Sequence, residues 1–415
     1  MVWIDMLDVS HSSPQHNNRD DLTLLHLIWE HPTKVVGGLG VAGAALCGTL
    51  KDKEGVKIRV IAPSDCLNVN LINTNTYQLG IEIEDALKLQ ASLENEQDLV
   101  GIKGAVADFT REVSLAHLTD PETNACSLVH AHDWMTAAAG VSVQRSQGVP
   151  LILHIHSTQV DREGAHARGA VYQHEKWAMQ QADTIIAVSD YTKRVIIDHY
   201  EISSDKIKVV RNASSADERD IALTRKSNLK KEPVVMFAGR LVAQKYPEAA
   251  VEIMVGALKQ VKNARGVIAG GGDKLKVIRE LVKFKGMGDR IEVLGNVPQK
   301  NMQAIYDTAA VLILPSISEP FGLVAMEAAR ARVAVILSDR CGASEVLKSA
   351  KVIELYQTDV WIDSLVRLLE NTELREAQVH QQMLDIEGYQ WSDAGDTILE
   401  IVNELVTKPV SGNVG

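Results

Sequence analysis

Two carboxylates eight residues apart, Glu319 and Glu327, flank the expected start of a helix. The apolar strand expected over 311–315 ends shortly before Glu319. Pro320 favours an extended backbone at Glu319 and itself suits the first helical turn. Three backbone N–H groups at the positive end of the helix dipole then lack intrahelical partners, those of Gly322, Leu323 and Val324. Two carboxylates around a phosphate cradle indicate chemistry on a nucleotide-activated group, whereas a surface helix with solvated glutamates is the alternative interpretation.

Two cations follow the first strand expected in the C-terminal half of the chain. Arg240 and Lys245 leave that strand end beside glycine, so both are placed to reach one diphosphate. A glycine run that includes Gly271 follows the next expected strand and allows a base or ribose to approach the backbone. These groups and the cradle at Gly322 fall at strand ends of one expected sheet, where open parallel sheets bind ligands. Isolated cations are usually solvated surface charges, but this agreement favours a site.

A second glycine cluster follows the first strand of the chain. Glycines at 37, 38 and 40 precede a helix of small residues and allow a ligand to approach Gly38 closely. The spacing differs from GxGxxG, and no acid about 20 residues further on completes a dinucleotide site. A plain flexible loop is the alternative.

Two His-x-His pairs end neighbouring strands of the N-terminal half. One pair is His130 and His132, followed by Asp133, and the other is His154 and His156. Residues two apart in a strand face the same side, so the members of each pair converge. One interpretation is a metal site, and another is a polar cleft lined by His156 and Asp133. The third is that His130 and His154 pack within the sheet and bond to the backbone.

Short apolar runs alternate with helical patterns along most of the chain. Strands that are apolar on both faces and separated by helices indicate parallel sheets covered on each side. The predicted strands are 24–29, 58–62, 127–131, 151–155, 184–188 and 206–210, then 234–238, 266–269, 291–294, 311–314, 333–337 and 351–354. We therefore predict an α/β fold with two doubly wound, Rossmann-like domains facing a cleft, followed by C-terminal helices. The expected units are a disordered segment 1–21, domains 22–224 and 225–390, and a helix and tail 391–415, which packs across the domains.

Composition narrows the functional classes. The net charge of −11 argues against nucleic acid as the main partner. No apolar run reaches the roughly 18 residues that a membrane helix needs. The first 21 residues lack the pattern of a signal peptide, and the four cysteines have no CxxC spacing, which predicts a reducing, cytoplasmic location. The oligomeric state is not predicted.

Taken in order, these residues resemble a retaining glycosyltransferase of the two-domain GT-B fold, in family 4 and near the glycogen and starch synthases. The matches run from Trp29 to Glu345, about three quarters of the chain. They comprise the early glycine loop, His-Ala-His-Asp-Trp at 130–134, His-Ser-Thr at 156–158 with Asp161 and Arg162, Ala-Val-Ser at 187–189, Gly-Arg-Leu at 239–241, the Glu-x7-Glu pair, and Gly342 to Val346.

The resemblance implies a role for each of these positions. Arg240 and Lys245 would neutralise the donor diphosphate, whose phosphates would bind the backbone at 322–324. Glu327 would hold the donor ribose, and Gly38 would let the N-terminal domain close over the phosphates. Further sugar, acceptor or base contacts would come from Asp133, Ser157, Asp161, Arg162 and Gly271.

The resemblance also implies the reaction. Glu319, as nucleophile or electrostatic partner, would lie beside the transferred sugar, with His156 across the cleft. The donor would be a nucleotide sugar, UDP- or ADP-glucose, and the acceptor a carbohydrate, a glucan. Because two cations and helix N–H groups complement the charge on the departing diphosphate, we predict that no metal and no other cofactor is required.

Four positions depart from the family pattern: Tyr246, Ala213, Arg332 and Cys341 stand where glycine is usual. Several of these sites are expected to need positive φ, at a cost of about 1 kcal/mol each. The departures keep open a catalytically weakened nucleotide-sugar-binding protein on the same fold. A metal-dependent hydrolase built on the His-x-His pairs, and a GT-B epimerase or phosphorylase, are further alternatives. Residues 64–126 match no pattern, and acceptor specificity is one role for them.

Overall fold

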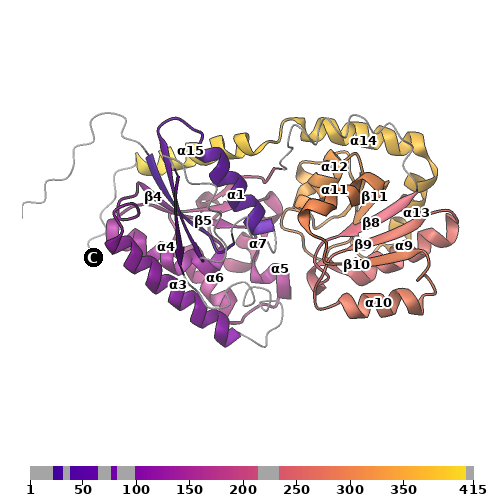
Figure 1. The fold of residues 1–415 in the computed structure, drawn as a ribbon, viewed down its shortest axis with the longest axis horizontal. Coiled ribbons are helices and arrows are strands. Elements are labelled where there is room, and N and C mark those ends of the chain that lie inside the picture. Colours follow the sequence, from indigo (N-terminus) through magenta and orange to yellow (C-terminus); the bar gives the residue numbers. More distant parts are fainter. Residues whose placement is uncertain (1–21, 31–37, 64–75, 82–98, 214–232, 408–415) are drawn as a thin grey trace, which may run out of the picture.

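The computed structural model describes residues 22–30, 38–63, 76–81, 99–213 and 233–407. The predictions made for the N-terminal segment 1–21, for the linker near residue 225 and for the tail beyond residue 407 lie outside these residues. Within them, the chain forms two parallel sheets, each covered by helices on both faces (Figure 1). The predicted fold class is confirmed.

The N-terminal sheet has seven parallel strands in the order β3-β2-β1-β4-β5-β6-β7. Six of them lie at predicted positions because their residues are apolar on both faces; β4 and β5 are buried along their whole length. The exception is β3, an edge strand within the uninterpreted stretch 64–126. The bounds are β1 Leu22–Leu27, β2 Val56–Pro63, β3 Thr76–Ile81, β4 Leu128–His132, β5 Leu151–Ile155, β6 Thr184–Ala187 and β7 Ile207–Val209.

The C-terminal sheet has six parallel strands in the order β10-β9-β8-β11-β12-β13, and all six were predicted. The central β8 and β11 carry their following loops to the same edge, where Arg240 and Glu319 lie. The bounds are β8 Val234–Ala238, β9 Arg265–Ala269, β10 Ile291–Gly295, β11 Val311–Leu314, β12 Ala334–Ser338 and β13 Lys351–Ile353.

Helices cover both faces of the N-terminal sheet. One face carries α3 (Leu99–Thr119), α4 (Asp133–Gln147), α6 (Ala170–Gln181) and α7 (Asp190–Tyr200), after the short α5 (Gln159–Glu163). The other face packs against α1 (Gly38–Leu50) and against α15 (Trp391–Val406), the last helix described. Figure 1 shows α15 returning from the C-terminal domain to lie beside α1. The C-terminal helix therefore adds Trp391 and Ile398 to the core of the first domain.

The C-terminal sheet is covered in the same way. One core contains residues of α9 (Pro247–Gln260), α10 (Leu275–Phe284) and α13 (Thr358–Glu370). The opposite core contains residues of α11 (Gln299–Thr308), α12 (Leu323–Arg330) and α14 (Thr372–Glu387). Two short 3₁₀ turns, η6 (Ala243–Lys245) and η7 (Gly342–Glu345), lie in loops at the edge facing the first domain. Among the described helices, none combines the length and the apolar character needed to cross a membrane.

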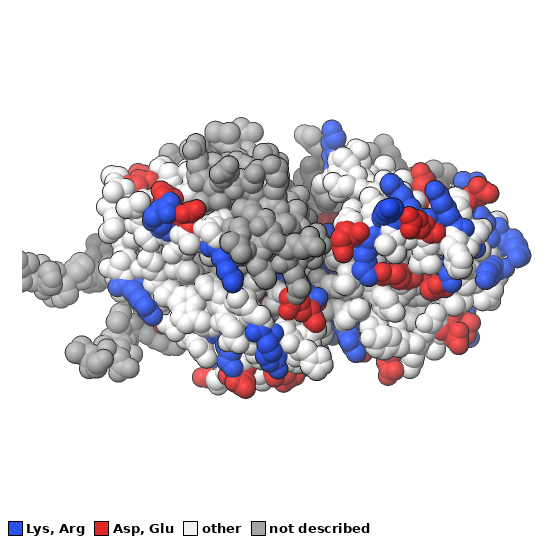
Figure 2. Space-filling model, turned by 90° about the horizontal axis from the view of Figure 1, so that it is seen from below, with Lys and Arg blue, Asp and Glu red and all other residues white. Residues whose placement is uncertain are grey.

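Charged side chains are interspersed on the surface of the C-terminal domain. Figure 2 shows basic and acidic residues alternating across one face of that domain, without a broad basic area.

Candidate active site

The residues predicted to form a phosphate cradle lie at the start of α12, and phosphate binding there stays a prediction. Gly322 precedes this helix with φ of +99°, in the left-handed region that favours glycine. A Cβ atom there would lie 3.1 Å from both the Cys341 Sγ and the Glu319 Cγ. Across from the helix start, a Cβ atom on Gly38 would lie 3.5 Å from the Leu323 Cδ1. The structure therefore brings together the two glycine sites that the sequence predicted separately, one from each domain.

Glu319 and Lys245 form an ion pair beside the cradle. The Lys245 Nζ lies 2.6 Å from the Glu319 Oε1, and the two side chains are only 14% and 12% exposed. The other carboxylate oxygen of Glu319 accepts a hydrogen bond from the Ser316 hydroxyl at 3.4 Å. Lys245, the cation predicted to bind the diphosphate, and Glu319, the carboxylate predicted to lie beside the sugar, thus neutralise each other in this structure.

Arg240 adds a second cation to the same place. Burial lowers the pKa of its guanidinium, and the carboxylates of Glu30 and Glu319 oppose that shift. Glu30, buried in the loop after β1, belongs to the N-terminal domain. Charges from both domains therefore meet at Arg240, and Glu30 is a site residue that the sequence patterns did not indicate.

The loop carrying Arg240 is held by the glycine run after β9. A Cβ atom on Gly270 would lie 1.8 Å from the Gly239 carbonyl oxygen, and one on Gly272 would lie 2.5 Å from that of Leu241. The Leu241 N–H donates to the Gly271 carbonyl at 2.7 Å. These glycines allow two loops to pack backbone against backbone, which is a structural reason for the run. Contact of Gly271 with a base or ribose stays a prediction.

Glu327 is bound through both carboxylate oxygens. The Tyr306 hydroxyl donates to Oε2 at 2.8 Å, and the Gln299 amide donates to Oε1 at 3.4 Å. Burial raises the pKa of Glu327, and both hydrogen bonds lower it. Its partners fix the carboxylate about one helical turn beyond the cradle. Neither Tyr306 nor Gln299 was a sequence candidate.

The glycine departures divide into two groups. Tyr246 and Arg332 have φ of +49° and +60°, so the left-handed conformation is kept without glycine. Cys341 has an extended backbone with φ of −117°. Ala213, among the residues that the structure describes, does not have positive φ. The expectation that several of these sites have positive φ is therefore confirmed at two of the four, Tyr246 and Arg332.

Across the cleft, His156 is anchored by Asp133. The His156 N–H donates to the Asp133 Oδ1 at 2.7 Å, and the Ser157 N–H donates to it at 3.4 Å. Asp133 opens α4 with φ of +55°, and burial raises the pKa of its carboxyl to about 7. Such strain in a non-glycine residue is concentrated at functional sites. His156 and Asp133 are therefore in contact, and the interpretation that they line a polar cleft stays a prediction.

The imidazole of His156 also bonds to a histidine. Its Nε2 lies 3.0 Å from the His132 Nδ1, while the His130 Nε2 lies 3.2 Å from the His154 Nδ1. The prediction that His130 and His154 pack within the sheet is confirmed, but they bond to each other through their rings. A fifth histidine, His26, joins the group through its Nδ1, 3.4 Å from the His132 Nε2.

Asp161 and Arg162 are held by protein groups. Asp161 accepts from the N–H and the hydroxyl of Thr158, the residue that caps α5, and from the Ser318 hydroxyl of the other domain at 2.5 Å. Arg162 pairs with the buried Glu175 at 2.8 Å. Both side chains therefore serve the architecture of the cleft, and a direct sugar or acceptor contact stays a prediction.

The two domains interlock around the loop that carries Glu319. The Ser189 and Thr192 hydroxyls donate to the Pro320 carbonyl, the Ser189 bond being 2.5 Å long. Glu345 accepts from the Asp190 and Tyr191 N–H groups at 2.9 and 2.8 Å. Its carboxylate thus satisfies the N-terminus of α7 from the opposite domain.

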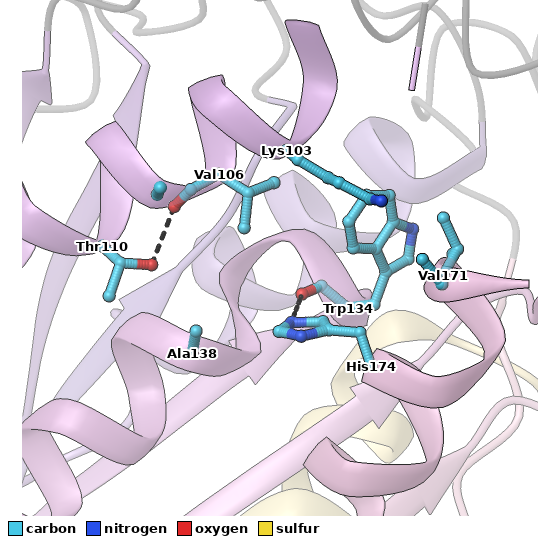
Figure 3. A pocket seen from close by; sticks show the side chains of 9 residues that line it. Lys103, Val106, Thr110, Trp134, Ala138, Val171 and His174 are labelled. Carbon is cyan, nitrogen blue, oxygen red and sulfur yellow. Dashed lines mark hydrogen bonds between the residues drawn. The ribbon is translucent and has the colours of Figure 1, made fainter. Parts of the chain in front are cut away.

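A largely apolar pocket of about 440 Å³ lies in the N-terminal domain, between α3, α4 and α6. Figure 3 shows Trp134 and His174 together, with the His174 ring bonded to the Trp134 carbonyl at 3.2 Å. Val106 and Val171 add apolar walls, and Lys103 lies at one side. Trp134, which lines the pocket, follows Asp133 directly in the chain.

Both halves of the chain match family models of glycosyltransferases. The family model of glycosyl transferases group 1 matches residues 220–382, and that of glycosyltransferase family 4 matches residues 110–217. An uncharacterized glycosyltransferase of Methanocaldococcus jannaschii is 26% identical over 393 residues, 88% of this chain and 94% of its own length. A glycogen synthase of Mycobacterium tuberculosis is 24% identical over 342 residues, 79% of this chain and 80% of its own.

Solved structures agree on the fold. Sucrose-phosphate synthase from Thermosynechococcus elongatus superposes with a TM-score of 0.75 at 17% identity, over 92% of this chain and 99% of its own. An Anabaena protein solved with UDP and glucose superposes with a TM-score of 0.65 at 16% identity, over 92% of this chain and all of its own. At these identities the likeness shows the fold alone.

Proposed function

Because this chain is a GT-B glycosyltransferase of the family 4 type, we propose that it transfers glucose from UDP- or ADP-glucose to a glucan, with retention of configuration. One observation carries the proposal: Arg240, Lys245 and the start of α12 converge beside Glu319, with Gly38 of the other domain opposite. Two cations and a helix N-terminus form a site for a diphosphate.

The proposed leaving-group chemistry follows from these charges. Breaking the bond between sugar and phosphate builds negative charge on the diphosphate, and fixed donors and cations stabilise it. Arg240 and Lys245 would take this charge together with the N–H groups at the start of α12. Lys245 is already bonded to Glu319, so a bound donor would share the lysine between its phosphate and that carboxylate.

The ribose end of the donor would be fixed by a carboxylate, and its sugar end by a histidine. Glu327, held by Tyr306, would accept from the ribose hydroxyls. His156, anchored through its backbone by Asp133, would contact the sugar from the opposite wall. Since cations and N–H groups neutralise the diphosphate, no metal is needed for the transfer step.

The alternative, a catalytically weakened nucleotide-sugar-binding protein, rests on the four positions where glycine is replaced. Tyr246 and Arg332 nevertheless hold the positive φ that glycine would supply, and Cys341 lies in an extended backbone that any residue adopts. The cleft therefore keeps its backbone path, which favours turnover over binding alone.

The test is nucleotide release from UDP-glucose, ADP-glucose and GDP-mannose, with and without glycogen. We expect acceptor-stimulated release from one glucose donor, and its loss in Glu319→Gln. The matched control is Glu248→Gln, which removes a carboxylate from an ion pair elsewhere in the same domain. Donor binding without release from any sugar would support the binding protein, whereas absence of binding would refute the site.

A further inference from the structure

Five histidines from neighbouring strands form a buried stack in the N-terminal domain. His26 lies beside His130 in the sheet register, and His132 lies beside His154. Four of these side chains have no exposed surface, and that of His156 is 8% exposed. Their strand neighbours two residues away belong to the apolar core beneath α1 and α15. The histidines thus occupy places that aliphatic residues fill along the same strands.

The stack leaves ring nitrogens unsatisfied. Three histidine–histidine hydrogen bonds use six of the ten nitrogens that five imidazoles carry. The other four, His26 Nε2, His130 Nδ1, His154 Nε2 and His156 Nδ1, are buried without a partner among the described residues. Buried polar atoms are normally satisfied, and an ion bound through the His130 Nδ1 would satisfy one of these four.

Imidazole is the ligand that this cluster offers. Each of the five rings carries two nitrogens, one of which can bind a metal ion while the other makes a hydrogen bond. Imidazole suits zinc, copper and nickel.

Two overlapping triads have ligand atoms within 4.8 Å of one another, and they share His132. Nitrogens around a tetrahedral zinc with bonds near 2.0 Å lie about 3.3 Å apart. The His26–His132 separation of 3.4 Å matches that spacing, whereas the His132–His156 separation of 3.0 Å is an ordinary hydrogen bond. We propose that His26, His130 and His132 bind one divalent transition-metal ion, zinc, inside the N-terminal domain.

The remaining hydrogen bonds support this choice of triad. A metal-bound histidine commonly donates its other ring N–H to a fixed acceptor. With His132 ligating through Nε2, its Nδ1–H donates to His156; with His130 ligating through Nδ1, its Nε2–H donates to His154. The second triad would use His156 itself. Three protein ligands leave a fourth position for water.

The ion would also orient a residue of the cleft. Donation by the His132 Nδ1–H occupies the Nε2 lone pair of His156, so His156 keeps its proton on Nδ1. This consequence rests on the proposed function, but occupancy of the triad does not. The ion is separate from the transfer step and differs from the hydrolase site that the sequence pattern left open.

The test is metal content of the full chain after loading with Zn²⁺ and removal of unbound ion. We expect about one zinc per chain, and visible absorption bands typical of tetrahedral nitrogen coordination after exchange with Co²⁺. His26→Leu and His130→Leu should each abolish stoichiometric zinc, whereas the exposed control His166→Leu should retain it. His154→Leu, which removes only an acceptor, should weaken affinity about 10- to 100-fold.

The metal measurement needs no sugar donor, so its failure and that of the proposed function are distinguishable. Wild-type protein that stays without zinc and shows no Co²⁺ bands overturns the proposal. Equal zinc in His26→Leu and wild type also overturns it. Should the leucine variants not fold, the Co²⁺ spectrum of the wild type decides.

Discussion

Removal of Lys245 tests whether the ion pair with Glu319 holds the cleft loops together. The Lys245→Met change keeps most of the aliphatic stem and removes the ammonium group. Glu319 then stays in a site where its side chain is only 12% exposed, without its cation at 2.6 Å. We expect the C-terminal domain to lose stability even in the absence of substrate.

The magnitude follows from distance and burial. At an effective dielectric constant of about 20, unit charges 2.6 Å apart attract by about 6 kcal/mol, most of which offsets desolvation. Breaking a buried pair on one side costs about 3–5 kcal/mol. Because both side chains retain some exposure, we expect about 3 kcal/mol and a fall in Tm of roughly 5–10 °C.

The assay is a double-mutant cycle of Lys245→Met and Glu319→Gln, read by thermal unfolding. We expect the double variant to be about 2 kcal/mol more stable than the sum of the single effects predicts. The control is Lys274→Met, whose ion pair with Glu248 is about one quarter exposed and should contribute less than about 1 kcal/mol. Nucleotide release should stay lost in all three cleft variants. Additive stability effects would refute the coupling.

Three further changes test the cleft. Gly322→Ala should lower the free energy of unfolding by about 1–3 kcal/mol, through strain at φ of +99°, and lower donor kcat/KM at least tenfold. The control is Gly388→Ala, where φ is negative and the space around the residue is open, and it should change neither Tm nor the kinetics. Tyr306→Phe removes a hydrogen bond that lowers the pKa of Glu327, so Glu327 becomes protonated at a higher pH in the variant. As pH is lowered, the donor KM of the variant should therefore begin to rise at a higher pH than that of wild type. Identical KM profiles between about pH 5 and 8 would contradict the ribose role. Glu345→Gln weakens the contact with α7, so small-angle scattering should show a larger radius of gyration without donor, and an unchanged radius would exclude that role.

The sheets were predictable because their strands are buried on both faces. Runs such as those of β4 and β5 are apolar throughout, apart from histidines, and turn signals bound them. β3 carries Tyr77 and Gln78 and pairs only with β2, so its residues need not be apolar. Its position depends on a neighbouring strand and leaves a weak local signal.

Site residues were predictable where the signal was local. The cradle at Gly322 follows from one strand, one proline and one glycine in sequence. Glu345 acts on the N-terminus of α7 from 155 residues away, and its role has no local pattern. His26 joins the histidine stack only because β1 lies beside β4, so its part required the strand order.

The loop from Ser318 to Gly322 is bonded to both domains, but the bond within the C-terminal domain does not depend on the other domain. The Gly342 N–H fixes the Glu319 carbonyl from within the C-terminal domain at 2.9 Å, while hydroxyls of the N-terminal domain bind the next carbonyl, that of Pro320. Moving the domains apart breaks those hydroxyl bonds, each worth about 1 kcal/mol, and leaves the Gly342 bond intact. The cradle therefore keeps its shape on opening, which suits a cleft that must admit an acceptor and release a nucleotide.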